Sequence, residues 1–513
     1  MTALAKLLTS FKSLDIKLTI DDDDKLVVRG NKANLTPDLI GRINANKTEL
    51  VGLLKSAKSG GQKITPQMLP LVKLTQQDID YIVAHVPGGV ANIQDIYPLG
   101  PLQQAILFHH MMEHEGGDPY VMPMLFKANT QAAFERFIKG LQFVMNRHDI
   151  LRTLVLWASL PEAVQVVLRE VSLSVQWIDT PTDEAPLSFM ERLCAPELQN
   201  MALDQAPLVK VQVTKGAESE EHFVLIQFHH MVSDHVGIDI IQQELAAFER
   251  GDTAGLATPM PYREFIAHTL HLAEQYDAGA YFKATLGDIT RSCLPFGLND
   301  IQGDGSRIIE RREALPEAVS EQLRAAAKQA RVSPAVLFHG AWGLLLSGFS
   351  ATEDVVFGTV VSGRLQGTSG AAHTVGVFMN TLPLRVRTHD GDGTVSELVA
   401  QVQRTLAELL PYEQASLAAA QRATSIVGDT PLFSGMLNYR HSALGEAIES
   451  DVFLVAGQER SNYPVSLLVD DLGQSFAVSV QLDSAVDAVQ VMQCTQALIA
   501  KLSEALLHSP EMP

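Results

Sequence analysis

The sequence is short of cysteine, of charge and of long apolar runs. Only three cysteines occur in 513 residues, Cys194, Cys293 and Cys494, and their wide separation gives neither a disulfide framework nor a zinc-ligand spacing. This usage fits a reducing cytosol, so we expect a cytoplasmic protein. No stretch reaches the length of a charge-free membrane span. The N-terminus carries lysines within its apolar stretch and no small-residue cleavage site, which is not typical of a signal peptide.

Several kinds of ligand-dependent chemistry are also not indicated. The sequence has no P-loop, no glycine-rich fingerprint after a strand and no His/Cys cluster at metal-ligand spacing. It has no basic tract, and 59 acidic against 39 basic residues give a net charge of −20, which disfavours nucleic acid. We therefore expect no bound cofactor and no metal. The chemistry must rely on side chains and on a substrate brought by something else.

The first 57 residues form a small unit of their own. An amphipathic helix is predicted over 2–14, followed by short strands at 15–20 and 25–30 around a run of four aspartates, which we interpret as a solvated turn rather than a metal site. A helix then begins with Thr36 as N-cap and Pro37 at its first position. Residues 1–58 carry ten basic and seven acidic side chains, so this unit is mildly basic.

The rest of the chain alternates strands and helices. Residues 58–90 begin with Ser, Gly and Lys and are predicted as a linker. Apolar patterning predicts strands at 123–129, 163–169, 208–214, 222–228, 355–362, 378–386 and 476–482, and helices at 131–148, 316–332, 334–350 and 394–410. Periodicity alone therefore gives an α/β fold in one large or two medium domains.

The stretch QFHHMVSDHVG, residues 227–237, has the strongest functional pattern. It connects a predicted buried strand to a predicted helix, so His229 and His230 stand at a rigid strand end, with Asp234 four residues after His230. A neutral imidazole has one donor and one acceptor and titrates near working pH, which suits a general base or a positioning group. The alternative is a structural histidine pair, which is common at strand ends.

Together with other segments in order, this stretch resembles the condensation domains of non-ribosomal peptide synthetases. FHHMVSDH is similar to their HHxxxDG motif. Further matching segments are YPLGPLQQAILF (97–108), MNRHDILRTLV (145–155), PYREF (261–265), VGVFMNTLPLRV (375–386), PLFSGMLNYRHS (431–442) and SNYPVSLLVDD (461–471). The resemblance covers about residues 90–513, and the α-β-β-α order of residues 1–57 resembles TubC-type docking domains.

The resemblance implies two chloramphenicol-acetyltransferase-like lobes in a V, which we place at 91–270 (N-lobe) and 271–513 (C-lobe). The active site would lie midway along a tunnel entered by the phosphopantetheine arms of upstream and downstream peptidyl carrier domains. The implied reaction joins a carrier-bound peptidyl thioester to a carrier-bound aminoacyl amine. Residues 1–57 would bind the C-terminal tail of an upstream subunit. No carrier-site Gly-Gly-x-Ser is present, so we expect the chain to be an N-terminal part of a larger subunit.

The resemblance also suggests roles for the central histidines. His230 would accept a hydrogen bond from the attacking amine or deprotonate it, and His229 would pack beneath the loop. Asp234 would form an ion pair that fixes the loop, with Arg152 and Arg385 as candidate partners. Two alternatives stay open: an ordinary condensation domain or free-standing acyltransferase, and a scaffold that has lost activity, although the intact motif argues against the second.

Two departures from the usual motif favour a dual epimerisation/condensation domain. His235 replaces the usual glycine, and a second pair, His109-His110, precedes GGDPY in a pattern similar to the extended signature of that subgroup. Inversion of an α-carbon needs acid/base groups that reach both of its faces, and a second imidazole pair could serve. Alternatively, His109-His110 merely end a helix, where a cation favours the dipole. Asn380 either lines the tunnel near the thioester or holds the lobe interface, and Ser362 is placed with it as tunnel lining or support.

Overall fold

The computed structural model describes residues 17–20, 26–29, 36–45, 47, 50, 63–112, 116–217, 220–364, 370–388, 393–428, 430–441, 451–457 and 461–512. At the N-terminus, strands β1 (Lys17–Ile20) and β2 (Leu26–Arg29) pair antiparallel, and helix α2 (Pro37–Ala45) follows. The Leu39 amide donates to Thr36 Oγ1 over 3.3 Å, which confirms the predicted N-cap. The predicted helix at 2–14 and the aspartate turn lie outside the described residues.

The prediction of a linker at 58–90 is wrong for residues 63–90. These residues form the 3-10 turn η2 (Pro66–Met68), helix α4 (Gln76–His85) and the start of α5 (Gly89–Asn92). Thr75 and Asp78 make a capping box at the start of α4. Ile79 and Ile82 are fully buried in a cluster shared with strands of the N-lobe. Apolar residues at helical spacing therefore outweigh the linker-like start of the segment.

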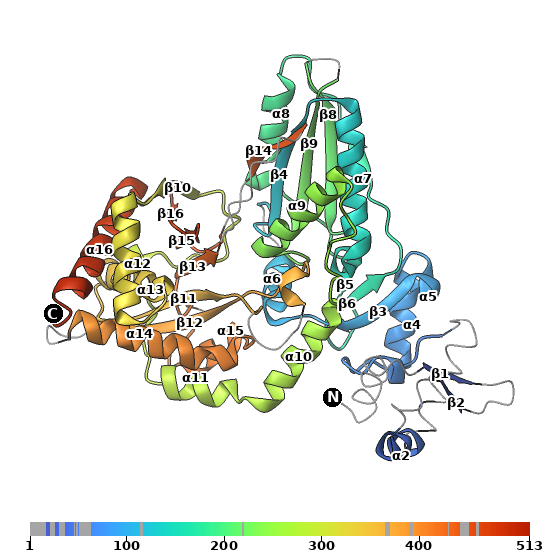
Figure 1. Cartoon of the computed structure of the whole chain (residues 1–513), viewed down its shortest axis with the longest axis horizontal. Helices are drawn as coiled ribbons and strands as arrows, with labels where there is room; N and C mark the ends of the chain where they lie inside the picture. The colour runs from blue at the N-terminus through green and yellow to red at the C-terminus, as the bar shows by residue number, and fades with distance from the viewer. Residues whose placement is uncertain are drawn as a thin grey trace.

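The N-lobe contains a five-stranded sheet in the order β14-β4-β9-β8-β7 and a three-stranded sheet in the order β3-β6-β5. Its strands are β3 (Ile93–Pro98), β4 (Val121–Ala128), β5 (Thr153–Leu156), β6 (Val164–Leu168), β7 (Val175–Trp177), β8 (Val209–Lys215) and β9 (His222–His229). Its helices are α6 (Pro101–Met111), α7 (Gln131–Arg147), α8 (Pro186–Leu193), α9 (His235–Arg250) and α10 (Tyr262–Gln275). Helices α7 and α9 pack together beside the larger sheet (Figure 1).

The C-lobe contains a six-stranded sheet in the order β10-β16-β15-β13-β11-β12. Its strands are β10 (Ile308–Ala314), β11 (Asp354–Val361), β12 (Asn380–Arg387), β13 (Gly435–His441), β15 (Val465–Asp471) and β16 (Phe476–Asp483). Its helices are α11 (Ala278–Leu286), α12 (Glu317–Ala330), α13 (Pro334–Ser350), α14 (Val395–Leu409), α15 (Leu417–Ala423) and α16 (Ala488–His508). Helix α13 is apolar on almost every side and lies in the core of this lobe.

None of the described helices is by itself long and apolar enough to cross a membrane. Helices α12 and α13 meet that criterion only when taken as a pair, and they are bent by 104° at their junction.

The two lobes are not separate in sequence, contrary to the predicted division at residue 271. Strand β14 (Val452–Gly457) comes from the C-terminal half but pairs antiparallel with β4 and completes the N-lobe sheet. Val375 and Phe378 likewise pack in the N-lobe core. An edge strand such as β4 leaves backbone groups unpaired unless another strand covers it, and β14 fills this role. Figure 1 shows the lobes as two arms of a V, with β14 beside β4 and α6 near the junction.

Candidate functional site

The central histidines follow the end of a fully buried strand. Every residue of β9 is buried, up to His229, which is 0% exposed. His230 is half-buried, and its amide donates to the Tyr120 carbonyl over 2.7 Å, which continues the pairing of β9 with β4. Helix α9 then begins with Asp234 as its N-cap, whose Oδ1 accepts from the Gly237 amide over 2.8 Å. The strand end and the helix start therefore fix both ends of a short loop.

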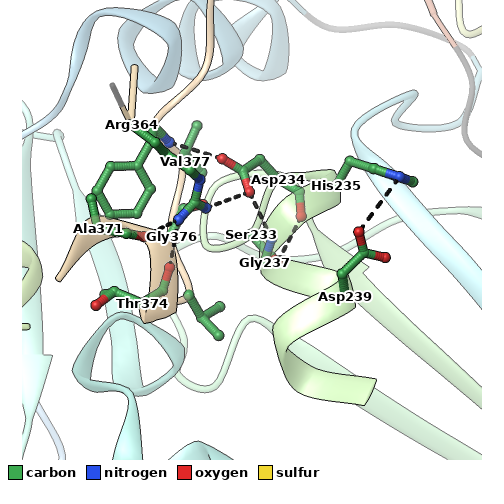
Figure 2. A network of polar contacts seen from close by, with 12 residues as sticks. Ser233, Asp234, His235, Gly237, Asp239, Arg364, Ala371, Thr374, Gly376 and Val377 are labelled. Atoms are coloured by element: carbon green, nitrogen blue, oxygen red, sulfur yellow. Dashed lines mark hydrogen bonds and ion pairs between the residues drawn. The ribbon is translucent and has the colours of Figure 1, made fainter. Parts of the chain in front are cut away.

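Asp234 forms a buried ion pair, but with neither of the predicted partners. Arg364 Nη2 donates to Asp234 Oδ1 over 2.7 Å, and the two side chains are 6% and 3% exposed. Asp234 Oδ2 accepts from the Phe378 amide over 3.1 Å. The guanidinium also donates to the Thr374 carbonyl and lies 4.0 Å from the centre of the Phe378 ring. Figure 2 shows this network, which ties the N-lobe loop to the C-terminal half of the chain.

The predicted partners of Asp234 lie elsewhere. Arg152 is buried and donates to the carbonyl groups of Met145 and Arg169 inside the N-lobe. Arg385 pairs with Asp354 and with Asp288 at one edge of the C-lobe sheet. The prediction of an ion pair for Asp234 was right in kind and wrong in partner.

Three of the matched motif segments meet around this loop. The Val375 amide donates to His148 Nδ1 over 3.2 Å. The Tyr262 hydroxyl donates to the Val377 carbonyl over 2.6 Å, and the Tyr262 amide donates to the Asp149 carboxylate. These motif residues therefore hold the lobes together at the site.

A carboxylate that sequence reasoning did not single out joins the two histidine pairs. Asp118 Oδ2 lies 3.1 Å from His229 Nε2 and 3.1 Å from His110 Nδ1. The Met231 amide donates to His229 Nδ1 over 3.0 Å, so that nitrogen is unprotonated and the proton sits on Nε2, facing Asp118. Burial alone would raise the pKa of the Asp118 carboxyl, but the hydrogen bonds from His110 and His229 outweigh it and hold that pKa well below its usual range.

The same cluster has the residue types of a metal site, but His229 Nε2 carries a proton, whereas a nitrogen that binds a metal must be unprotonated. The ligand atoms of His110, Asp118 and His229 lie within 4.8 Å of one another. A metal on His229 Nε2 would move the ring proton to Nδ1, where it would face the Met231 N–H donor. The hydrogen bonds of the free protein therefore fit an Asp–His cluster and do not fit a bound metal.

One histidine of each pair lines a large cavity between the lobes. The cavity has a volume of about 1240 Å³, and His109 and His230 are in its wall, whereas His110 and His229 are not. The wall is formed by the exposed side of α6, by residues of β13, β15 and β16, and by the segment 461–463. Each pair thus directs one imidazole to the cavity and the other to Asp118.

His230 has a defined basic nitrogen. Its Nδ1 lies 3.1 Å from the Ser233 carbonyl, which can only accept, so Nδ1 carries the proton of the neutral ring. The lone pair of the neutral imidazole is then on Nε2, the nitrogen that can accept a proton. The loop therefore fixes which nitrogen of the neutral His230 ring carries the lone pair.

The remaining predicted residues have supporting positions. Asn380 lines the cavity, but its Nδ2 donates to the Glu413 and Ala415 carbonyls, so its amide hydrogens hold that loop rather than a substrate. The His235 side chain points away from Arg364 and toward Asp239, and His235 Nε2 lies 3.9 Å from Asp239 Oδ2 (Figure 2). Ser362 is exposed and is not among the cavity-lining residues that the structure describes.

Sequence reasoning missed four residues of the site. Asp118 and Tyr120 stand in GGDPY, a pattern that by itself indicates no role for either side chain. Gly117 before them lies so close to the Pro196 carbonyl that a Cβ atom would overlap it, which explains the glycine. Arg364 belongs to no matched motif, so only the fold reveals it. Tyr463, in SNYP, lines the cavity.

Family models match almost the whole chain. A model described as "Condensation domain" matches residues 93–513, and one described as "TubC N-terminal docking domain" matches residues 4–56. Malpinin synthetase of Mortierella alpina is 40% identical over 88% of this chain, and tyrocidine synthase 2 of Brevibacillus parabrevis is 26% identical over 74%. The chain spans only 6% and 11% of the length of these two relatives.

Solved structures of low sequence identity share the fold. The condensation domain from Monacolin K polyketide synthase superposes with a TM-score of 0.64 at 18% identity, covering 82% of this chain and 99% of that one. A four-domain nonribosomal peptide synthetase gives a TM-score of 0.66 at 17% identity, covering 82% of this chain and 33% of that one. The mixed α/β architecture of two acetyltransferase-like lobes is therefore that of solved condensation domains.

Proposed function

Because the chain belongs to the condensation-domain family of non-ribosomal peptide synthetases, we propose that it joins a carrier-bound peptidyl thioester to the amine of a carrier-bound aminoacyl thioester, after inverting the donor residue from L to D. Both substrates would arrive on phosphopantetheine arms of separate carrier domains, and the cavity between the lobes would hold the two reacting ends.

His230 is the residue we assign to the condensation step. Its Nε2 is the basic nitrogen, and the ring is held by the Ser233 carbonyl and by the buried loop that Asp234 anchors. Aminolysis of a thioester needs little activation, so a base that also orients the amine is sufficient. His229 does not face the cavity, and we assign it the role of keeping the loop in place through Asp118.

The observation that supports the proposal of epimerisation is that the two histidine pairs are arranged in the same way around the cavity and Asp118. His109 and His230 line one cavity, while His110 and His229 share Asp118. A pair that merely ended a helix would have no reason to share a buried carboxylate with the catalytic loop. Removal of the donor α-proton by one cavity imidazole and return of a proton to the opposite face by the other would invert the carbon.

The test is a comparison of two reactions catalysed by the same variants. N-acetyl-L-leucyl and N-acetyl-D-leucyl pantetheine thioesters serve as donors, and L-leucyl pantetheine serves as acceptor. His109→Ala should lose α-deuterium exchange of the L donor in D₂O but still join the D donor. His85→Ala, at an exposed position near the end of α4, is the matched control and should change neither reaction.

Two results would contradict the assignment. If His109→Ala lowers condensation of the D donor as much as exchange of the L donor, His109 serves the common site and not epimerisation. If the unmodified protein joins only L donors and exchanges no α-proton, the chain is an ordinary condensation domain.

Residues 1–57 are proposed to bind the C-terminal tail of an upstream subunit. The antiparallel pair of β1 and β2 offers strand edges to which an extended peptide can add. The mild excess of basic residues in 1–58 favours a tail with acidic residues.

A further inference from the structure

Two tyrosines, one from each lobe, face the cavity with hydroxyl groups that bond to no described residue. Tyr120 and Tyr463 both line the cavity. The described residues offer no hydrogen-bond partner to either hydroxyl, whereas the hydroxyl groups of Tyr262 and Tyr439 donate to Val377 and Asp471. A hydroxyl on a cavity wall can bond to a polar group of a substrate that enters the cavity. A substrate group is therefore a candidate partner for both hydroxyls.

Tyr120 is held beside both cavity histidines. Its carbonyl accepts the His230 amide over 2.7 Å, so the two residues stand opposite each other where β4 and β9 pair. Side chains opposite each other on neighbouring strands point to the same face. The Tyr120 ring also meets the His109 ring edge-on, with centroids 5.8 Å apart, and the Tyr120 amide donates to Asp118 over 2.8 Å.

Tyr463 is held with similar rigidity from the C-lobe. Its ring stacks on Phe433, with centroids 5.8 Å apart and an interplanar angle of 16°. Its amide donates to Ser461 Oγ over 3.0 Å, and the residue is only 9% exposed. The hydroxyl therefore has a fixed direction before any substrate binds.

Both hydroxyls remain protonated and thus remain donors. Burial raises the pKa of Tyr463, and burial together with the nearby Tyr463 and Asp118 raises the pKa of Tyr120. Tyr120 and Tyr463 come from different lobes and line the same cavity.

We propose that the Tyr120 and Tyr463 hydroxyls together bind the carbonyl oxygen of the donor thioester and stabilise the negative charge that develops on it. This inference rests on the proposed function. In condensation, the amine nitrogen attacks the thioester carbon, the C–N bond forms, and the carbonyl π pair moves onto the oxygen that accepts from the two hydroxyls. The C–S bond then breaks, the carbonyl re-forms, and the sulfur leaves as a thiol with the proton that the amine gave up through His230.

The same oxygen carries charge in epimerisation. Loss of the donor α-proton delocalises an electron pair onto the thioester oxygen, and reprotonation at carbon returns it. Rigid donors aimed at such an oxygen lower both barriers, because they need no reorganisation when the charge appears. Removal of either hydroxyl should therefore slow both reactions by a similar factor, unlike removal of His109.

The experiment uses Tyr120→Phe, Tyr463→Phe and the double variant of the full chain, with the leucyl pantetheine thioesters as probes. Each single variant should lower kcat for condensation of the D donor by roughly 10²-fold with little change in KM, and should slow α-deuterium exchange of the L donor by a similar factor. Tyr281→Phe, at an aromatic stack outside the cavity, is the control and should keep the kcat of the unmodified protein.

Each outcome of the experiment either supports the proposal or overturns it. Single variants that keep kcat within about threefold for both reactions would overturn it, and so would a rise in KM at unchanged kcat, because charge stabilisation acts on the transition state. Each Tyr→Phe change deletes one oxygen, and unchanged unfolding midpoints show that any loss of kcat is not structural. If the unmodified protein itself forms no peptide bond, the proposed function has failed instead, which is a distinct result.

Discussion

The substitution Asp234→Ala should both destabilise and inactivate the protein, because it removes the ion pair with Arg364. The carboxylate accepts three hydrogen bonds, from Gly237, Phe378 and Arg364, and its ion-pair partner is itself buried. Removal of one member of a buried pair leaves an uncompensated charge, which costs about 3–5 kcal/mol. The loop that carries His230 would lose its anchor, so the rate of condensation should fall along with stability.

The assay is urea unfolding followed by tryptophan fluorescence, together with the rate of condensation. Asp234→Ala and Arg364→Met should each shift the unfolding midpoint, and the double variant should cost about 1–3 kcal/mol less than the sum of the single changes, since both remove one contact. Asp288→Ala is the control, because Asp288 is 61% exposed and its ion pair should contribute no more than about 1 kcal/mol. An Asp234→Ala protein that is inactive but unfolds at the original midpoint would refute this reasoning and indicate a carboxylate that acts on the substrate.

Three further predictions concern other parts of the chain. His230→Ala should lower condensation by roughly 10²–10⁴-fold with an unchanged unfolding midpoint, and a near-normal dipeptide yield would contradict the base assignment. Burial raises the pKa of the Glu413 carboxyl from 4.5 to about 7, so the folded protein favours the neutral acid. The stability that this preference contributes is present below pH 4.5 and is lost as the pH rises through 7. Glu413→Gln should therefore stabilise the protein by about 3 kcal/mol at pH 8 and leave it unchanged at pH 4, and equal midpoints at pH 8 would show that the carboxyl is not desolvated. Deletion of residues 1–57 should abolish binding of an acidic upstream tail peptide without affecting condensation of soluble thioesters, and unchanged binding would remove the docking assignment.

Elements that depend on local patterning could be read from the sequence. Helix α13 has the predicted bounds 334–350, and strand β9 matches the predicted 222–228 to within one residue, because a continuous apolar run or a 3.6-residue period is a property of neighbouring residues. The linker prediction failed because the order of residues 63–90 depends on contacts with distant parts of the chain. The start of that segment is typical of a linker, and the buried contacts that order residues 63–90 come from distant strands.

A residue of the site could be predicted from the sequence only where it belongs to a recognised motif. The motif places His229 and His230 at the end of a buried strand, as the structure has them, and the second histidine pair meets them at Asp118. The catalytic roles of these histidines stay predictions. The partner of Asp234 could not be predicted, because Arg364 lies 130 residues away and no local pattern distinguishes it from Arg152 or Arg385. The pairing of β14 with β4 of the other lobe could not be predicted either, because the apolar pattern of a strand does not show which sheet it joins.

The central claim is that one cavity performs inversion and then condensation. The most direct measurement is the mass and chirality of the dipeptide formed in D₂O from N-acetyl-L-leucyl pantetheine and L-leucyl pantetheine by the unmodified protein. The expected product has a donor residue that is D and carries one deuterium at its α-carbon. A product with an unlabelled L donor residue would contradict it.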